Sequence, residues 1–490
     1  MVTFEDKATS ILNVFEDCTR DQQNEVLQRL LLKCKPLQLR VLYNELKPLL
    51  AVDFAATLPP ELTERIFSFL TSEDLCHVAC CSKVWRDRAN NDMIWLHLCK
   101  LQNWQHYGTI TDLSSERPFS PNQTNLATSL SSPTFSFDSV VSSTGLQETC
   151  KWKQTYMRAH HLDKNWETGR YRVAPLLRGH KEQVTCIDCD DTLLVSGSSD
   201  TTVRIWNVFT GECIHKLEEH TDSVTCLKMK KNLLVTGCAD SIVRVFDAKT
   251  ARCRNALHGH TSGVDCICFD GTTIISASSD HSLRVWTLPE GVCRQILRGH
   301  TDDIQFVITF NHLAASAAWD NTVKLWDTTK GLCLHTLQGH TEVVYCCQFD
   351  NSIVVSGGGD ETLRIWDTAT GMCKQTLYGH KGEVYCLQYN SEIIASGASD
   401  STVILWNHRG ECLNIMQEHI GVVRCLCLHG NKLITGGDRK KIVVWNAKNG
   451  NLLNVVHRNP SLLHVMWVSD TRLITASPES PGVITILSYW

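Results

Sequence analysis

Two hydrophobic patterns divide this chain of 490 residues. From residue 171 onward, short apolar or alternating runs are separated by loops rich in Gly, Asp, Ser and Thr, as in residues 184–188, 193–197, 203–207 and 213–217. Such runs predict β-strands joined by tight turns. In residues 54–100 the apolar positions follow helical spacing instead. The pattern predicts an α+β multidomain protein with a helical N-terminal part and an all-β C-terminal part.

The all-β part repeats with a period of 40 residues. Each unit has a histidine, a hydroxyl residue 16 positions later and an aromatic residue 26 positions later, and the first six units have an aspartate 20 positions after the histidine. In the first, third and fifth units these residues are His180, Ser196, Asp200 and Trp206; His260, Ser276, Asp280 and Trp286; and His340, Ser356, Asp360 and Trp366. Such a repeat in constant phase indicates one structural unit used seven times.

The repeat resembles the WD-repeat β-propeller over residues 171–490. In that family the aspartate fixes the imidazole, the imidazole meets the hydroxyl, and the hydroxyl accepts the indole N–H, each bond contributing on the order of 1 kcal/mol. The alternative, that the histidines are metal ligands or catalytic bases, is disfavoured because seven copies are spread around a ring. Phe246 has no N–H to donate and Arg439 stands at the aspartate position of the seventh unit, so both networks are expected to be incomplete.

The C-terminal end predicts a degenerate eighth blade. Residues 462–468, 473–476 and 483–487 resemble three strands, although the Gly-His pair is missing. Residues 172–177, from the start of the ring, would supply the outer strand, and this closure would remove exposed strand edges. The alternative is a ring of seven blades followed by a tail.

Residues 54–100 predict a compact helical domain in which Pro59 and Pro60 open one helix and Ser72 opens another. The sequences LPPEL (58–62), IFSFL (66–70), DL (74–75), CSKVW (81–85) and IW (94–95) resemble the F-box. That motif binds the Skp-type adaptor of cullin-based ubiquitin ligases. The resemblance implies adaptor contacts by Leu58, Pro59, Leu62, Ile66, Leu70, Leu75, Val84, Trp85, Ile94 and Trp95.

Residues 1–53 predict a helical segment that is broken at Pro36. Apolar stripes on both sides of the break resemble the dimerisation segment of F-box/WD-repeat receptors. The contacts expected there are Leu27, Leu30, Leu31, Leu39, Leu42 and Leu46. The alternative is an N-terminal cap packed on the F-box.

Two further segments join the F-box to the propeller. Residues 101–147 are rich in Ser and Thr and poor in charge, which predicts a disordered linker. Residues 148–170 predict a linker helix that carries Trp152, Tyr156 and Met157. In related receptors a helix at this place links the F-box and the propeller rigidly.

Composition and charge exclude several classes of function. The net charge of −5 and the pI of about 6.5 argue against nucleic-acid binding. No apolar run reaches the ~18 residues of a membrane span, and the N-terminus has no signal peptide, so we expect a cytoplasmic or nuclear protein. The 24 cysteines are therefore expected to stay reduced. Cys186 and Cys189 lie three apart in one predicted strand and point to opposite faces, so no metal or other cofactor is expected.

The loop positions of the repeats predict a binding face. In each unit this face would consist of the residues three and five positions after the histidine and the residue before the aspartate. The expected substrate contacts are Asp265, Asp303, Gln305, Trp319, Tyr345, Glu383, Tyr385 and Arg424. Receptors that read phosphorylated segments carry arginines in the third and fourth blades, where this chain has Asp265, Ser279 and Gln305. Aromatic residues beside acids would suit an apolar or basic peptide.

The resemblances together imply a non-catalytic substrate receptor of an SCF (Skp–cullin–F-box) ubiquitin ligase. Its partners would be the Skp-type adaptor, the cullin reached through it, a protein substrate and a second copy of the chain. The alternative is a propeller scaffold that organises proteins without ubiquitination. An enzyme is disfavoured because the sequence has no nucleophile elbow, phosphate loop or paired-carboxylate site. The sequence does not identify the substrate.

Overall fold

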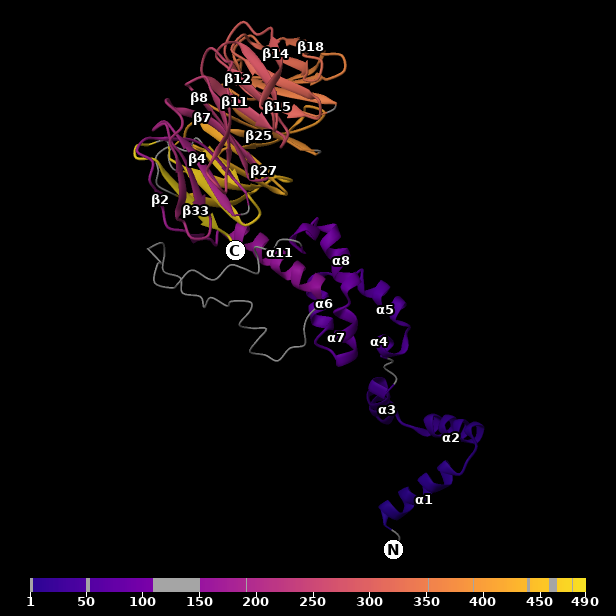
Figure 1. The fold of residues 1–490 in the computed structure, drawn as a ribbon. Coiled ribbons are helices and arrows are strands. Elements are labelled where there is room, and N and C mark those ends of the chain that lie inside the picture. Colours follow the sequence, from indigo (N-terminus) through magenta and orange to yellow (C-terminus); the bar gives the residue numbers. More distant parts are fainter. Residues whose placement is uncertain are drawn as a thin grey trace. The chain divides into compact units, whose positions relative to one another are not determined.

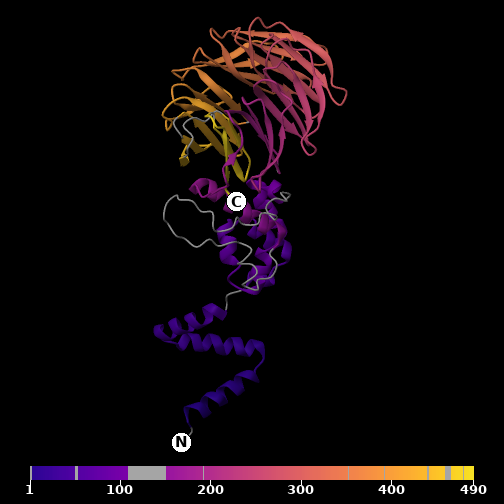
Figure 2. The same ribbon diagram turned by 60° about the vertical axis from the view of Figure 1, so that its left-hand side comes forward.

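The computed structural model describes residues 3–49, 53–108, 150–190, 192–350, 352–390, 392–438, 441–457, 465–477 and 479–490. These residues form two compact units, a helical unit that extends to Met157 and a β-unit that begins at Arg158 (Figures 1 and 2). Most of the predicted Ser/Thr-rich linker, from residue 109 on, lies outside the described residues. No helix that the structure describes is long and apolar enough to cross a membrane.

Three helices precede the F-box: α1 (Phe4–Glu16), α2 (Arg20–Lys33) and α3 (Pro36–Leu49). The break between α2 and α3 falls where it was predicted, because proline disfavours a helical residue before it. Helix α1 lies within the predicted helical segment 1–53, although the sequence analysis did not mark it as a separate helix. A reciprocal pair of hydrogen bonds between Thr3 and Asp6 caps its first turn.

The F-box consists of five short helices: α4 (Phe54–Thr57), α5 (Pro60–Phe67), α6 (Ser72–Val78), α7 (Lys83–Ala89) and α8 (Asp92–Leu101), followed by the 3₁₀ turn η1 (Gln105–Gly108). Four of these helices begin at a side chain that accepts a backbone N–H, namely Asp53, Thr71, Ser82 and Asn91. The long helix α11 (Lys151–Thr168) begins beside α8, where Tyr156 lies 5.3 Å from Trp95 between ring centroids. The caps fix the short helices around one core.

Eight four-stranded blades form the β-unit, whose last blade has a fifth short strand. In the first blade β3 (Val184–Cys189), β4 (Leu193–Ser198), β5 (Val203–Asn207) and β6 (Cys213–Leu217) pair in chain order. The next six blades are built from β7 (Val224–Lys230), β8 (Leu233–Cys238), β9 (Val243–Asp247), β10 (Cys253–Leu257); β11 (Val264–Phe269), β12 (Thr273–Ser278), β13 (Ser282–Thr287), β14 (Val292–Arg298); β15 (Ile304–Phe310), β16 (Leu313–Ala318), β17 (Thr322–Asp327), β18 (Leu332–Gln338); β19 (Val344–Phe349), β20 (Ile353–Gly358), β21 (Leu363–Asp367), β22 (Cys373–Leu377); β23 (Val384–Tyr389), β24 (Ile393–Ala398), β25 (Val403–Asn407), β26 (Cys412–Met416); and β27 (Val423–His429), β28 (Lys432–Gly437), β29 (Lys441–Asn446), β30 (Leu452–His457).

The two ends of the ring share the eighth blade. It contains β31 (Val465–Val468), β32 (Arg472–Ala476) and β33 (Val483–Ser488), and β33 pairs with β1 (Arg172–Val173) and β2 (Leu177–Arg178) (Figure 1). The predicted closure is therefore confirmed, and the alternative of seven blades with a tail is wrong. The outer strand is split between β1 and β2, and Pro175, which lies between them, has no N–H for a ladder bond.

The end of α11 packs on the eighth blade. The ring of Trp166 stacks on Tyr489 at 3.6 Å between centroids, and its indole N–H donates to the carbonyl oxygen of Asp470 at 2.7 Å. Asn165 donates a side-chain N–H to the carbonyl oxygen of Tyr489 at 2.8 Å. Because Trp166 is almost fully buried, these contacts make the last turns of α11 part of the propeller.

Candidate functional site

The repeated histidines form the hydrogen-bonded networks of the blades. In the first blade Nδ1 of His180 lies 3.1 Å from Asp200, and Nε2 lies 2.8 Å from the hydroxyl of Ser196, which also accepts the indole N–H of Trp206 at 2.9 Å. The corresponding three distances are 2.8, 2.8 and 2.9 Å at His260, and 2.9, 2.8 and 2.9 Å at His340. Each network ties the loop before a blade to the turn that carries its aspartate.

Burial favours the neutral form of His180 and His260, and hydrogen bonds keep Asp200 charged. Burial lowers the pKa of His180 and of His260, against the attraction of their aspartates. Burial alone would raise the pKa of Asp200, but hydrogen bonds from Thr202 and from the N–H of Lys181 lower it to about 2. The order Asp, His, Ser is also that of a catalytic triad, but Ser196 is fully buried and its hydroxyl also accepts the indole N–H of Trp206, so these residues hold the blade together.

Blade 2 reverses this arrangement around His220. Nη1 of Arg244 lies 2.5 Å from Nδ1 of His220 and 2.7 Å from Asp240. Because a guanidinium only donates, Nδ1 accepts, and the imidazole proton must be on Nε2, which lies 2.7 Å from the hydroxyl of Thr236. That hydroxyl then accepts the N–H of Nε2 and donates to the carbonyl oxygen of Arg244 at 3.5 Å, while Phe246 provides no indole N–H. The tautomer of His220 is therefore opposite to that of the histidines whose Nδ1 donates to aspartate.

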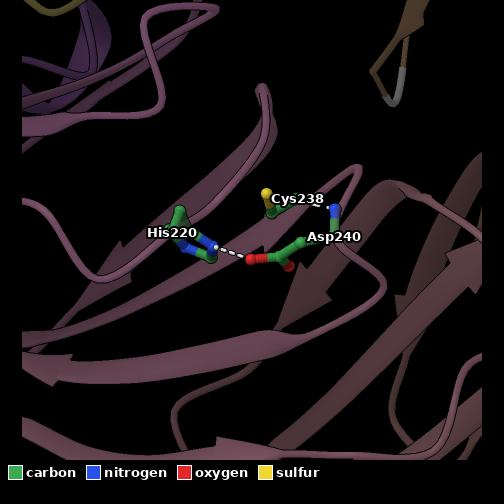
Figure 3. Close-up of side chains that lie close together, drawn as sticks. All are labelled: His220, Cys238 and Asp240. Carbon is green, nitrogen blue, oxygen red and sulfur yellow. Dashed lines mark hydrogen bonds and ion pairs between the residues drawn. The ribbon is translucent and has the colours of Figure 1, made fainter.

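His220, Cys238 and Asp240 offer ligand atoms within 4.8 Å of one another, as a metal site would (Figure 3). However, the guanidinium of Arg244 contacts both His220 and Asp240 and already supplies positive charge there. Sγ of Cys238 donates to the carbonyl oxygen of Asp222 at 3.1 Å and accepts the N–H of Asp240 at 3.3 Å. All three side chains are thus already paired within the protein, and we assign them a structural role.

Blade 7 has an incomplete network. Nε2 of His419 lies 2.8 Å from the hydroxyl of Thr435, which also accepts the indole N–H of Trp445 at 2.9 Å. Nδ1 of His419 has no hydrogen-bond partner among the described residues. Burial lowers the pKa of this histidine to about 4. The prediction for Arg439 concerns a residue outside the described part.

A β-bulge in each of the first seven blades positions the predicted binding face. Between the two innermost strands the register shifts by one residue, for example where Val344 pairs with Gly358 and Cys346 pairs with Gly357. The residue left without a partner is the one five positions after the histidine, and a bulge re-aims such a side chain. These residues are Thr185, Thr225, Asp265, Gln305, Tyr345, Tyr385 and Arg424.

A backbone hydrogen bond joins the other two face positions in every one of these blades. The carbonyl three positions after the histidine accepts the N–H of the residue before the aspartate position, as between Asp303 and Trp319 at 2.9 Å. Trp319 is 46% exposed, whereas the seven bulge residues are half-buried. The predicted face thus consists of short segments held in one geometry and varied only in their side chains.

In blades 5 to 7 the face is a chain of aromatic and charged groups. The hydroxyls of Tyr345 and Tyr385 both donate to Glu383, at 3.1 and 2.6 Å, and the two rings lie 4.9 Å apart between centroids. The hydrogen bond to Glu383 raises the pKa of Tyr385 to about 12. The guanidinium of Arg424 lies 5.6 Å from the ring of Tyr385, and its Nε donates to Asp438 at 3.2 Å. Arg424 is thus already paired with a carboxylate.

In blades 3 and 4 the face is acidic. The hydroxyl of Ser279 donates to Asp265 at 2.6 Å. Burial and the nearby charge of Asp303 raise the pKa of Asp265. Asp303 lies 3.6 Å from Nδ1 of His281. The predicted contact Gln305 is half-buried beside them.

The F-box exposes only part of the predicted adaptor surface. Leu62, Ile66 and Val84 are 50%, 42% and 40% exposed. Pro59 is also exposed, and Leu58, Leu70 and Trp85 are half-buried. Trp85 donates its indole N–H to Asp53 at 2.6 Å.

Three residues of that predicted set are placed differently. Leu75, Ile94 and Trp95 are at most 2% exposed, so their side chains hold the F-box together and face no partner. Helical spacing shows that residues share a face, but it does not show which face the neighbouring helices cover. The sequence analysis missed Phe69, which is 82% exposed beside this surface, although it belongs to the IFSFL sequence.

The N-terminal helices also expose apolar residues. Leu27, Leu30 and Leu31 of α2 and Leu39 and Leu42 of α3 are 38–55% exposed. The side chain of Leu46 lies outside the described part. An exposed apolar stripe of this kind is a surface that a partner could cover.

Fold and surfaces thus define a protein that joins an F-box to an eight-bladed propeller. Residues 55–101 match the F-box-like family, and residues 172–207, 211–247, 251–287, 291–327, 331–367, 371–407 and 410–446 match the WD domain, G-beta repeat family. The repeats alone cover more than half of the chain. The chain belongs to the WD-repeat family, in the group that carries an F-box before the repeats.

Relatives in other organisms share parts of this chain. A probable E3 ubiquitin ligase complex SCF subunit sconB of Arthroderma otae is 27% identical over 208 residues, which are 42% of this chain and 30% of that protein. F-box/WD repeat-containing protein 7 of Drosophila melanogaster is 33% identical over 192 residues, which are 39% of this chain and 13% of that protein. F-box/WD repeat-containing protein pof1 of Schizosaccharomyces pombe is 29% identical over 242 residues, which are 42% of this chain and 40% of that protein. Each match thus spans less than half of the relative.

A solved structure shares the propeller fold. The crystal structure of the computationally designed Ika8 protein superposes with a TM-score of 0.61 at 28% sequence identity. The superposition covers 64% of this chain and 98% of that one.

Proposed function

We propose that this protein is a non-catalytic substrate-recognition subunit of an SCF-type ubiquitin ligase. One observation carries the proposal: the same chain has an F-box with an exposed apolar surface and a propeller whose face differs in its side chains from blade to blade. The F-box would hold the Skp-type adaptor and, through it, the cullin. The propeller face would hold the target protein.

Such a subunit needs no catalytic residues of its own. A target held on the propeller would have its lysines at high effective concentration near the ubiquitin-conjugating enzyme, which accelerates transfer by proximity. The histidines of the first, third and fifth blades fit this assignment, because both ring nitrogens of each form hydrogen bonds within the fold.

The adaptor surface provides the direct test. Leu62→Ala together with Ile66→Ala should abolish co-purification of the adaptor and cullin, because central apolar contacts of an interface typically contribute ~2 kcal/mol or more each. Both residues are exposed, so the F-box should stay folded. Val292→Ala, on an exposed propeller strand, is the matched control and should leave adaptor binding unchanged. Equal adaptor recovery with the double variant would contradict the proposal.

We also propose that α2 and α3 pair with a second copy of the chain. Their exposed leucines form two stripes separated by the break before Pro36, and burying them between two chains would remove this apolar surface from water. A dimeric receptor would present two propellers to one target.

A further inference from the structure

The face of the propeller combines a local excess of acid with exposed or half-buried aromatic rings. In blades 3 to 6, the first five residues after each histidine include five carboxylates and one lysine, Lys381. The carboxylates are Asp265, Asp302, Asp303, Glu342 and Glu383. An anionic ligand brought to these blades would meet repulsion, whereas a cationic one would be attracted.

The most ordered part of this face is Glu383 between two tyrosines. Both hydroxyls donate to the same carboxylate oxygen, at 3.1 Å from Tyr345 and 2.6 Å from Tyr385, which fixes the charge between two aromatic rings. A carboxylate attracts a guanidinium or an ammonium by charge, and a ring face beside it adds cation–π attraction. The neighbouring Trp319 adds an exposed ring on blade 4.

Arg424 shows that this surface already binds a cation. Its guanidinium lies over the ring of Tyr385 at 5.6 Å, and its Nε donates to Asp438 at 3.2 Å. The same pairing removes Arg424 as a free phosphate ligand, because a phosphate would have to displace Asp438. The chain's own arginine thus occupies the kind of position that a basic residue of a ligand would take.

Resting on the proposed receptor role, we propose that the propeller face recognises an unphosphorylated basic segment of its target. A lysine or arginine of that segment binds Glu383 beside the hydroxyls of Tyr345 and Tyr385, and further positive charge of the segment lies toward Asp265 and Asp303. The two acids in blades 3 and 4 lie close enough for one to raise the pKa of the other, and an arriving cation would relieve that repulsion.

A peptide array tests the class of ligand. The probe is the purified full-length chain, applied to degenerate nine-residue peptides in which one position is fixed in turn, with phosphoserine and phosphothreonine among the fixed residues. Arginine and lysine should be selected, and glutamate and both phosphoresidues should be depleted. Binding of the selected peptide should weaken as salt rises, because the attraction is screened. Selection of phosphopeptides, or no selection of any fixed residue, would overturn the proposal.

Matched variants test the site. Glu383→Gln should lower the affinity for the selected peptide about tenfold, the effect expected from the loss of one charge-assisted contact. Glu290→Gln is the control, because Glu290 lies in the loop between β13 and β14, at the opposite end of a blade from the loops with the histidine and the aspartate. Asp303→Asn provides a second variant, and unchanged thermal unfolding shows that the variants are folded.

Arg424→Gln separates the two classes of ligand by the direction of its effect. Under the proposal it frees Asp438 and the face of Tyr385, so the basic peptide should bind as well as before or more tightly. If the face reads phosphate, the same change should abolish binding. A chain that holds the adaptor but loses phosphopeptide binding in Arg424→Gln would keep the receptor role and refute this inference. A chain that selects basic peptides without holding the adaptor would support this inference and refute the receptor role.

Discussion

The propeller should lose stability when the pH falls from 7.5 to 5, because several of its histidines are buried in the neutral form. Burial lowers the pKa of His220 and of His419 to about 4, with Arg244 adding to the effect at His220 and Lys441 at His419. In an unfolded chain a histidine titrates near ~6.5. Each therefore takes up a proton on unfolding at any pH between about 4 and 6.5, and the free energy of unfolding falls with pH in that window.

The size of the effect follows from the two pKa values. For a histidine at about 6.5 unfolded and about 4 folded, linkage gives a loss of about 2 kcal/mol between pH 7.5 and pH 5. His220 and His419 together should therefore cost about 4 kcal/mol, and the lowered pKa values of His180 and His260 act in the same direction. The network aspartates titrate lower, with Asp200 at about 2, so they should add a second loss only below pH ~4.

Chemical denaturation followed by tryptophan fluorescence measures this effect. The unfolding midpoint of the full chain should fall steadily through pH 6.5, 6.0, 5.5 and 5.0, and it should not change between pH 7.5 and 8.5. His419→Gln removes one titrating group and should reduce the loss at pH 5 by about half of the 4 kcal/mol. A midpoint that is flat or rises on acidification would refute the assignment of these imidazoles as neutral in the fold.

Two further predictions concern the packing of α11 on the propeller and the N-terminal helices. Trp166→Ala should lower the stability of the propeller by about 3–5 kcal/mol, since it removes a buried ring that stacks on Tyr489, whereas Trp319→Ala at an exposed ring should change it by less than ~0.5 kcal/mol in the same denaturation assay. Deleting residues 3–49 should halve the particle mass measured by light scattering without changing propeller unfolding, and a full-length chain that is monomeric at micromolar concentration would contradict the proposed dimer.

The repeat was predictable because its hydrogen bonds need particular side chains at particular spacings. His180, Ser196, Asp200 and Trp206 contact one another only when the loop before β3 and the turn after β4 come together beside β4 and β5, so the spacing in the chain reports the fold. The strand bounds of the first blade agree with the prediction to within one residue. The F-box helices were predictable for a similar reason, since capping side chains and Pro60 mark where they begin.

Other features depend on tertiary contacts that no local pattern reports. Helical spacing placed Leu62, Leu75 and Ile94 on apolar faces, but only the packing of α5 to α8 decides that Leu75 and Ile94 are inside and Leu62 is outside. In the same way, nothing local shows that Arg244 turns inward to His220. The bulges, which decide where Tyr345 and Arg424 lie, were also not predicted, although each one interrupts the alternation: the buried residues beside it stand three positions apart, as Val184 and Ile187 do.

Blade 7 links the stability of the propeller to what its face can bind. Its acid, Asp438, stands one position before the place where six other blades carry the network aspartate. That displacement leaves Nδ1 of His419 without a partner among the described residues, and it puts a carboxylate on the face instead, 3.2 Å from Nε of Arg424. A shift of one residue thus removes a structural hydrogen bond and neutralises the one arginine among the predicted face positions. Blade 7, whose network is incomplete, thus also pairs the arginine of the predicted face with a carboxylate, which supports the proposed preference of the face for positive charge.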